Sequence, residues 1–196
     1  MKKAFAIPFH SLLFSLAFGI MATSCNNESS TTEESKEKDA VASEVKMAQA
    51  DVTGTKADTS VNGTVKFNQD GDGKVKMDLE VLIPKMANHS VAVHIHEHGD
   101  CGDAGKNTHG HWNPTNKQHG KWGTGEYHSG DIGNIQLDSA GKGTLTMETD
   151  IWSIGGDVQK DILGKAIIVH SGVDDYTSQP SGNAGSRIGC GLIQKK

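Results

Sequence analysis

The feature that most constrains the fold is a pair of stretches, residues 60–69 and 74–83, in which apolar side chains occupy alternate positions. The apolar positions that share one face are Val61, Val65, Phe67, Val75, Met77, Leu79, Val81 and Ile83. A period of two is typical of a β-strand with one buried face. The segment DGDG at positions 70–73 separates the two stretches, and Asp-Gly turns in this setting predict a β-hairpin.

Further short alternating stretches follow the same plan and bring the expected total to about eight strands. They cover residues 46–54, 90–97, 134–138, 144–149, 165–170 and 187–194. Regular short strands separated by turn signals predict an antiparallel sandwich or barrel. Two segments interrupt this pattern as long loops, 98–133 and 171–186, and long loops inside a compact domain are usually functional. We also expect a short helical turn within residues 151–163.

Histidines gather in the first of these loops and in the strand before it. Eight of the ten histidines lie between positions 89 and 128, and histidine is the commonest metal ligand in proteins. His94 and His96 stand two apart in an expected strand, so both side chains leave the same face and Ile95 points into the core. Two neighbouring imidazoles favour a shared metal, although a pair of surface histidines is the alternative.

The candidate ligands divide into two groups. His119, His128 and Asp131 with His111 make a four-ligand set of the kind that binds structural zinc. His94, His96 and His170 supply three imidazoles for a second ion. His111 lies between the groups in sequence and can complete both sets, because two cations permit an imidazole to lose both ring protons.

The N-terminus predicts export. Lys2 and Lys3 precede an uncharged apolar stretch, and the small residues before Cys25 resemble a bacterial lipoprotein processing site. We therefore expect residues 1–24 to be a lipoprotein-type signal peptide, with Cys25 lipidated and anchoring the chain to a membrane. Plain secretion and a membrane-anchoring signal helix are the alternatives. Residues 26–44 are polar and read as a disordered tether, leaving 45–196 as one folded domain.

Charge and cysteine content narrow the class of partner. The formal charge of −5 becomes −7 once residues 1–24 are removed, since that segment carries two lysines and no acidic residue. A mildly acidic chain is a poor nucleic-acid binder, so we expect no nucleic-acid partner. With Cys25 lipidated, Cys101 and Cys190 remain for one disulfide in an oxidising compartment, two buried free thiols being the alternative.

Several segments together resemble the copper/zinc superoxide dismutases. They are HIHEHGD, GHWNP, KQHG, YHSGDIGN, IIVHSGVDD and GNAGSRIGCG, and they occur in family order over residues 45–194. The resemblance implies an all-β, eight-stranded antiparallel Greek-key β-barrel or sandwich of the immunoglobulin-like type, with two long functional loops. It also implies an enzyme that converts superoxide to dioxygen and hydrogen peroxide in antioxidant defence.

The same resemblance implies a role for each matching residue. Copper would be bound by His94, His96, His111 and His170, and zinc by His111, His119, His128 and Asp131. Asp174 would be an outer carboxylate that joins a copper histidine to a zinc histidine, and Cys101 would pair with Cys190. His111 would carry a proton in the reaction. Arg187 would guide the superoxide anion, and as the only arginine beside eighteen lysines it is a fork donor suited to a small anion.

Other interpretations of the same residues stay open. A copper or zinc buffer or delivery protein would need the histidines but neither Arg187 nor Asp174, and a structural envelope domain would need none of them. His89, His98 and His109 match no family position, and we interpret them as surface residues or adventitious metal contacts. The resemblance leaves monomer and homodimer open. From the expected lipid anchor on Cys25 we expect the protein in the bacterial cell envelope, in the periplasm or on the outer-membrane surface.

Overall fold

The computed structural model describes residues 45–196, so the expected signal peptide, lipidated Cys25 and tether lie outside the described residues. The described part forms one sheet of nine strands. They are β1 (Lys46–Gly54), β2 (Asn62–Gln69), β3 (Val75–Leu82), β4 (Ser90–His96), β5 (Gly133–Gln136), β6 (Lys142–Thr149), β7 (Ala166–His170), β8 (Arg187–Leu192) and β9 (Gln194–Lys195).

The predicted hairpin is β2–β3, with Gln69 opposite Val75 at the turn and Asn62 opposite Leu82 at the far end. Its alternation sets the burial, since Val65, Phe67 and Met77 are fully buried and their sequence neighbours are more exposed. Burying side chains of this size stabilises the fold by roughly 1.5–3 kcal/mol each.

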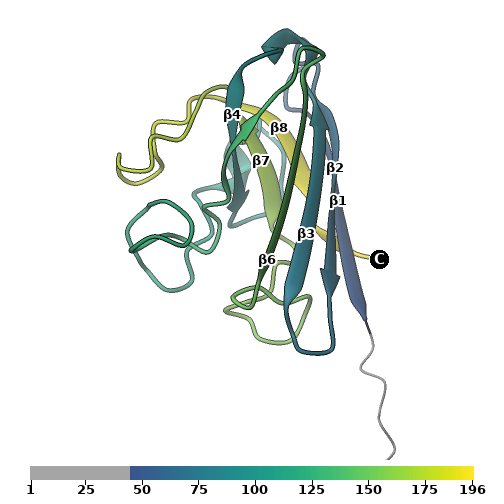
Figure 1. Cartoon of the computed structure of the whole chain (residues 1–196), viewed down its shortest axis with the longest axis vertical. Helices are drawn as coiled ribbons and strands as arrows, with labels where there is room; N and C mark the ends of the chain where they lie inside the picture. Colours follow the sequence, from purple (N-terminus) through teal and green to yellow (C-terminus); the bar gives the residue numbers. More distant parts are fainter. Residues whose placement is uncertain (1–44) are drawn as a thin grey trace, which may run out of the picture. The chain divides into compact units, whose positions relative to one another are not determined.

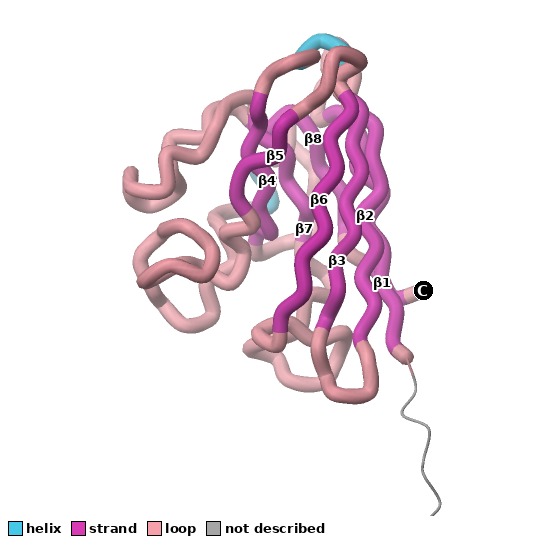
Figure 2. Tube along the Cα trace, viewed as in Figure 1, coloured by secondary structure: helices cyan, strands magenta, loops and turns pink. Residues whose placement is uncertain are grey.

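The strand order β5-β4-β7-β8-β1-β2-β3-β6 gives the all-β topology that the sequence predicts. The terminal strands β5 and β6 are consecutive in the chain and lie against each other, so the sheet curls into a nearly closed barrel (Figure 2). The chain passes from the β3–β6 pair to the β4–β7 pair twice, once between β3 and β4 and once between β6 and β7. Such crossings make a Greek key.

One expected strand needs correction. The last strand, expected over 187–194, is split at the fully buried Ile193. The backbone of Ile193 exchanges hydrogen bonds with Gly164 and Lys165 instead of continuing the ladder. The short helical turn expected within residues 151–163 is present as a single turn, in which the Asp161 N–H donates to the Asp157 carbonyl at 2.8 Å. Short 3-10 helices occur at Pro84–Met86 and Lys106–Thr108. Within residues 45–196 no helix is long and apolar enough to cross a membrane.

The two long loops leave the barrel on the same side (Figure 1), the earlier one in green and the later one in yellow. Cys101, near the start of the first loop, forms a disulfide with Cys190 in β8, with an S–S distance of 2.00 Å and a sequence separation of 89. The first loop is therefore covalently tied to the strand that begins at Arg187.

Candidate metal centre

Strands β4 and β7 supply three of the histidines. His94 and His96 leave the same face of β4, while Ile95 between them lies in the hydrophobic core. His170 is the last residue of β7, the strand that pairs with β4. All three imidazoles are buried, with 0%, 1% and 5% of the residue exposed. Buried ring nitrogens need a partner, because an unpaired polar group in the interior is costly.

Backbone bonds bring the first loop back to β4. The Trp112 N–H donates to the Ile95 carbonyl at 2.8 Å, the Ile95 N–H donates to Gly130 at 2.9 Å, and the Gly130 N–H donates to Trp112 at 3.0 Å. The indole N–H of the fully buried Trp152 donates to the Ser129 carbonyl at 2.8 Å. The loop segments around Trp112 and Gly130 are thereby fixed beside the histidines of β4. The neighbouring ligands of the loop, His111 and Asp131, are fixed with them.

The first ligand group contains four buried histidines, each with a ligand atom within 4.8 Å of the others: His94, His96, His111 and His170. Their inward nitrogens are His94 Nδ1, His96 Nε2, His111 Nε2 and His170 Nε2, and none has a hydrogen-bond partner in the described residues. The opposite ring nitrogens of His96 and His170 contact the carbonyls of His109 and Gly185, at 2.8 and 3.3 Å. Those carbonyl contacts fix each ring with its free nitrogen facing the group.

The second group is closed around a carboxylate. His111 Nδ1 lies 2.7 Å from Asp131 Oδ1, His128 Nδ1 lies 3.2 Å from the same oxygen, and His119 Nδ1 lies 3.0 Å from Asp131 Oδ2. Each of the four residues has a ligand atom within 4.8 Å of the ligand atoms of the others. His111 belongs to both groups, with Nδ1 facing one and Nε2 facing the other.

Asp174, from the second long loop, joins the two groups. Its Oδ2 accepts a hydrogen bond from His94 Nε2 at 2.9 Å, and its Oδ1 accepts one from His119 Nε2 at 2.9 Å. Asp174 thus contacts one histidine of each group. Gly182 permits the contact, because a Cβ at that position would lie 1.9 Å from Asp174 Oδ1, and its φ of +66° suits glycine.

The donor sets fit two different ions. The buried, partnerless ring nitrogens are an observation of this structure that calls for a ligand, since an unpaired buried polar atom is costly. A group of four imidazoles suits copper, whereas three imidazoles and a carboxylate make a four-coordinate site of the zinc type. Both groups therefore fit the metals that the resemblance implies.

Burial sets the proton affinity of the site in the metal-free protein. It lowers the pKa of His111 to about 4 and that of His170 to about 3. Burial alone would also lower the pKa of His119, but hydrogen bonds to Asp131 and Asp174 outweigh it and raise that pKa to about 9. The same histidine contacts hold the pKa of both carboxyls below the usual range, against the effect of burial. His111 and His170 are consequently neutral at pH 7, as metal ligands must be.

Arg187 lies at the mouth of the first group. Its guanidinium donates to the carbonyls of Gly105 (2.6 Å), Lys106 (3.1 Å) and His109 (2.5 Å) and to Thr108 Oγ1 (3.1 Å). The side chain is thus held by the loop that the disulfide ties to β8. It lines a hollow of about 780 Å³ together with His96, His111 and His170.

Two further residues help to build this site, and no sequence pattern points to them. Thr108 is fully buried, and its Oγ1 lies 3.3 Å from His96 Nδ1 as well as accepting from Arg187. The Gln179 side chain binds the backbone of His119. Both act on parts of a loop backbone, and no residue spacing signals such contacts in advance.

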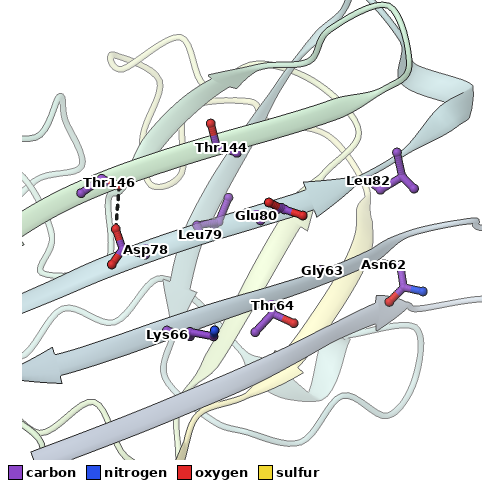
Figure 3. A pocket seen from close by; sticks show the side chains of 10 residues that line it. All are labelled: Asn62, Gly63, Thr64, Lys66, Asp78, Leu79, Glu80, Leu82, Thr144 and Thr146. Atoms are coloured by element: carbon purple, nitrogen blue, oxygen red, sulfur yellow. Dashed lines mark hydrogen bonds between the residues drawn. The ribbon is translucent and has the colours of Figure 1, made fainter.

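A second hollow, of about 660 Å³, lies on the outer face of β2, β3 and β6 (Figure 3). Asp78 and Thr146 are hydrogen-bonded across it at 2.7 Å. Its lining holds no histidine or cysteine: Asn62, Gly63, Thr64, Lys66, Asp78, Leu79, Glu80, Leu82, Thr144 and Thr146. Among residues 45–196 the candidate metal ligands therefore lie at the loop side of the barrel and not in this second hollow. His89, His98 and His109 are not members of either ligand group.

The family model for copper/zinc superoxide dismutase matches residues 61–193, which is most of the chain. The chain belongs to the copper/zinc superoxide dismutase family. A copper/zinc superoxide dismutase of Kluyveromyces lactis is 39% identical over 151 residues, covering 70% of this chain and 92% of the relative. Superoxide dismutase [Cu-Zn] 2 of Aquifex aeolicus is 36% identical over 124 residues, covering 61% of this chain and 71% of the relative.

A solved structure agrees with these relatives. The crystal structure described as that of the clock protein EA4 superposes with a TM-score of 0.66 at 30% sequence identity, covering 76% of this chain and 93% of that one. Membership of the family makes this protein a superoxide dismutase that uses copper and zinc, with superoxide as its substrate. The expected fold class and the expected activity are thereby confirmed.

Proposed function

We propose that the first ligand group holds the copper and the second holds the zinc, with His111 bridging them. The observation that carries this assignment is the division of the inward ring nitrogens into an all-imidazole group and a group closed by Asp131. Copper accepts four imidazoles, and zinc favours a tetrahedral set that includes a carboxylate. His111 would be a ligand of both ions, because it is a member of both groups.

When bound, copper supplies the exchange of one electron with each of two superoxide ions in turn, and zinc supplies a fixed charge without redox chemistry. The remaining work falls to side chains of this chain. Two superoxide ions and two protons give dioxygen and hydrogen peroxide. His111 would carry one proton at Nε2 while that nitrogen is not bound to metal and would deliver it to the reduced substrate, and solvent would supply the second.

Arg187 concentrates the anionic substrate at the copper group. The chain is acidic overall, with a formal charge of −5, so its average field repels superoxide. A fixed guanidinium at the mouth of a hollow reverses that field locally and raises the rate of encounter. Four hydrogen bonds hold the group in place, which spares the enzyme the entropy of ordering it at each turnover.

The assignment is tested by metal analysis and turnover in the same preparation. The protein is loaded with copper and zinc, and His128→Ala is compared with the unchanged chain. His128 belongs only to the second group, so we expect this variant to lose zinc before copper and to loosen the first loop. Loss of copper with zinc retained would reverse the assignment. Two bound metals without turnover would make the chain a metal-binding protein rather than an enzyme.

We also propose that the protein works in a bacterial cell envelope, anchored by a lipid on Cys25. The support is in the sequence: a basic start, an apolar stretch and small residues before Cys25, followed by the polar tether. Labelling cells with an alkyne fatty acid tests this. We expect label on the wild-type protein in the membrane fraction and none on Cys25→Ser. Sedimentation of the detergent-solubilised protein decides between monomer and homodimer.

A further inference from the structure

Three exposed side chains outside both ligand groups form a third cluster: Glu97, His98 and His109, with ligand atoms within 4.8 Å of one another. We propose that this cluster binds a third divalent transition-metal ion, of the zinc and copper class, at the rim of the active-site hollow. The site is distinct from the two inner ones, because it shares no ligand with them.

Backbone pairing holds the cluster together. The Glu97 N–H donates to the Gly110 carbonyl at 3.1 Å, and the His98 N–H donates to the Thr108 carbonyl at 3.2 Å. These two bonds bracket His109 and place it opposite the end of β4. The rings of His98 and His109 meet edge to face, with centroids 4.5 Å apart and planes at 86°. Their proximity therefore follows from the fold and does not depend on two mobile side chains meeting.

The backbone of His109 adds a second observation. Its φ of 61° and ψ of −143° lie in a region that glycine adopts freely and other residues enter at a cost of about 1–3 kcal/mol. The chain carries histidine there all the same. In this conformation the carbonyl accepts hydrogen bonds from His96 and Arg187. The imidazole itself stays exposed beside His98.

The three side chains are free to coordinate. Within residues 45–196 none of them makes a side-chain hydrogen bond or an ion pair of 4.0 Å or less. Lys165, which interacts electrostatically with Glu97, has its ammonium 4.7 Å from the centre of the Trp112 ring. Two imidazoles and one carboxylate favour zinc or copper over calcium or magnesium, and they leave positions open for water.

The location gives the site a consequence for the enzyme. Glu97 and His109 line the same 780 Å³ hollow as His96, His111 and Arg187. An ion held there adds positive charge at the entrance for superoxide. It also fixes the segment whose carbonyls hold Arg187.

The test is equilibrium dialysis of the full chain against Zn²⁺, after the inner sites have been loaded with copper and zinc. Bound metal is counted by elemental analysis. We expect three ions per wild-type chain and two for His98→Ala. Removing a ligand should weaken the third ion by about tenfold or more, as even indirect changes around a metal do. The matched control is His89→Ala, an exposed histidine outside the cluster, which should keep three ions.

Glu97→Gln provides a variant of the same shape, and we expect its affinity for the third ion to fall by about tenfold. A wild-type chain that binds only two ions would overturn the proposal, as would a third ion retained by both His98→Ala and Glu97→Gln. The copper and zinc counts come from the same samples. If the copper and zinc assignment of the inner groups is wrong, the wild-type protein will hold fewer than two inner ions. That result is distinct from loss of the third ion.

Discussion

The side-chain amide of Gln179 binds both backbone polar groups of His119: its Oε1 accepts from the N–H and its Nε2 donates to the carbonyl, each at 2.9 Å. One residue of the second loop thereby fixes a ligand of the first. We expect Gln179→Ala to weaken zinc by about tenfold, within the usual range for residues that orient a ligand. Competition with a zinc chelator measures this. Gln118→Ala, a glutamine next to the same histidine, should leave the affinity unchanged.

Asp174 links the two ligand groups through one carboxylate. Asp174→Asn keeps the shape but replaces one acceptor oxygen with an N–H donor, which would face the N–H of His94 or His119. We expect zinc affinity to fall by about 10–100-fold. Chelator competition gives the zinc affinity, and the Cu²⁺ electron paramagnetic resonance spectrum should change at the same time. An unchanged spectrum with unchanged zinc affinity would remove the positioning role from this residue.

Arg187 should matter for rate and not for metal content. Arg187→Ala removes the positive charge, and we expect kcat/KM to fall by about tenfold or more and to depend less on ionic strength. Arg187→Lys keeps a charge but loses the planar fork, so its rate should lie between the two. Pulse radiolysis at several salt concentrations measures this. Equal rates for all three proteins at low salt would mean that the substrate is guided by other groups.

The Cys101–Cys190 disulfide should stabilise the protein and hold Arg187 in place. Cys190→Ser is expected to reduce the free energy of unfolding by roughly 2–5 kcal/mol, the usual loss for a native disulfide. Urea unfolding of the metal-loaded protein tests the stability. The rate should fall in the same variant, because the loop that accepts the hydrogen bonds of Arg187 is no longer tied to β8. A variant with wild-type stability and a low rate would separate the two effects.

The metal-free protein should be most stable near neutral pH. His111 and His170 have folded pKa values of about 4 and 3, below the 6.5 of an exposed histidine. The unfolded chain then binds more protons between those values, so stability falls as the pH decreases from about 6.5. His119 acts in the opposite direction: its pKa of about 9 means that stability falls as the pH rises from 6.5 through 9.

Urea titrations of the metal-free protein between pH 4 and 9 check both limbs, and each unit of pKa shift is worth about 1.4 kcal/mol at most. Bound metal should steepen the acid limb, because a coordinated nitrogen cannot take a proton in the folded protein while the same histidine in the unfolded chain still can. A metal-free protein with constant stability from pH 6.5 to 4 would show that these rings are not buried in solution.

The sequence predicted the barrel strands well because alternation reports directly on burial, as in the β2–β3 hairpin. It also brought the ligands into two sets, since His94 and His96 stand two apart in a strand. It could not anticipate Thr108 or Gln179, whose contacts depend on loop backbone that folds back over the barrel. The break at Ile193 was not predicted either. It arises because the Ile193 N–H donates to the carbonyl of Lys165, which lies outside any strand.

Among residues 45–196, His111 alone belongs to both ligand groups, so seven side chains do the work of eight. Substitutions in the two groups should therefore show epistasis, because disturbance of either group reorients a ring that serves the other. The order of assembly also acquires a meaning. Whichever ion arrives first occupies one ring nitrogen of His111 and orients the ring for the second arrival, so the order of loading should set how fast the complete site forms.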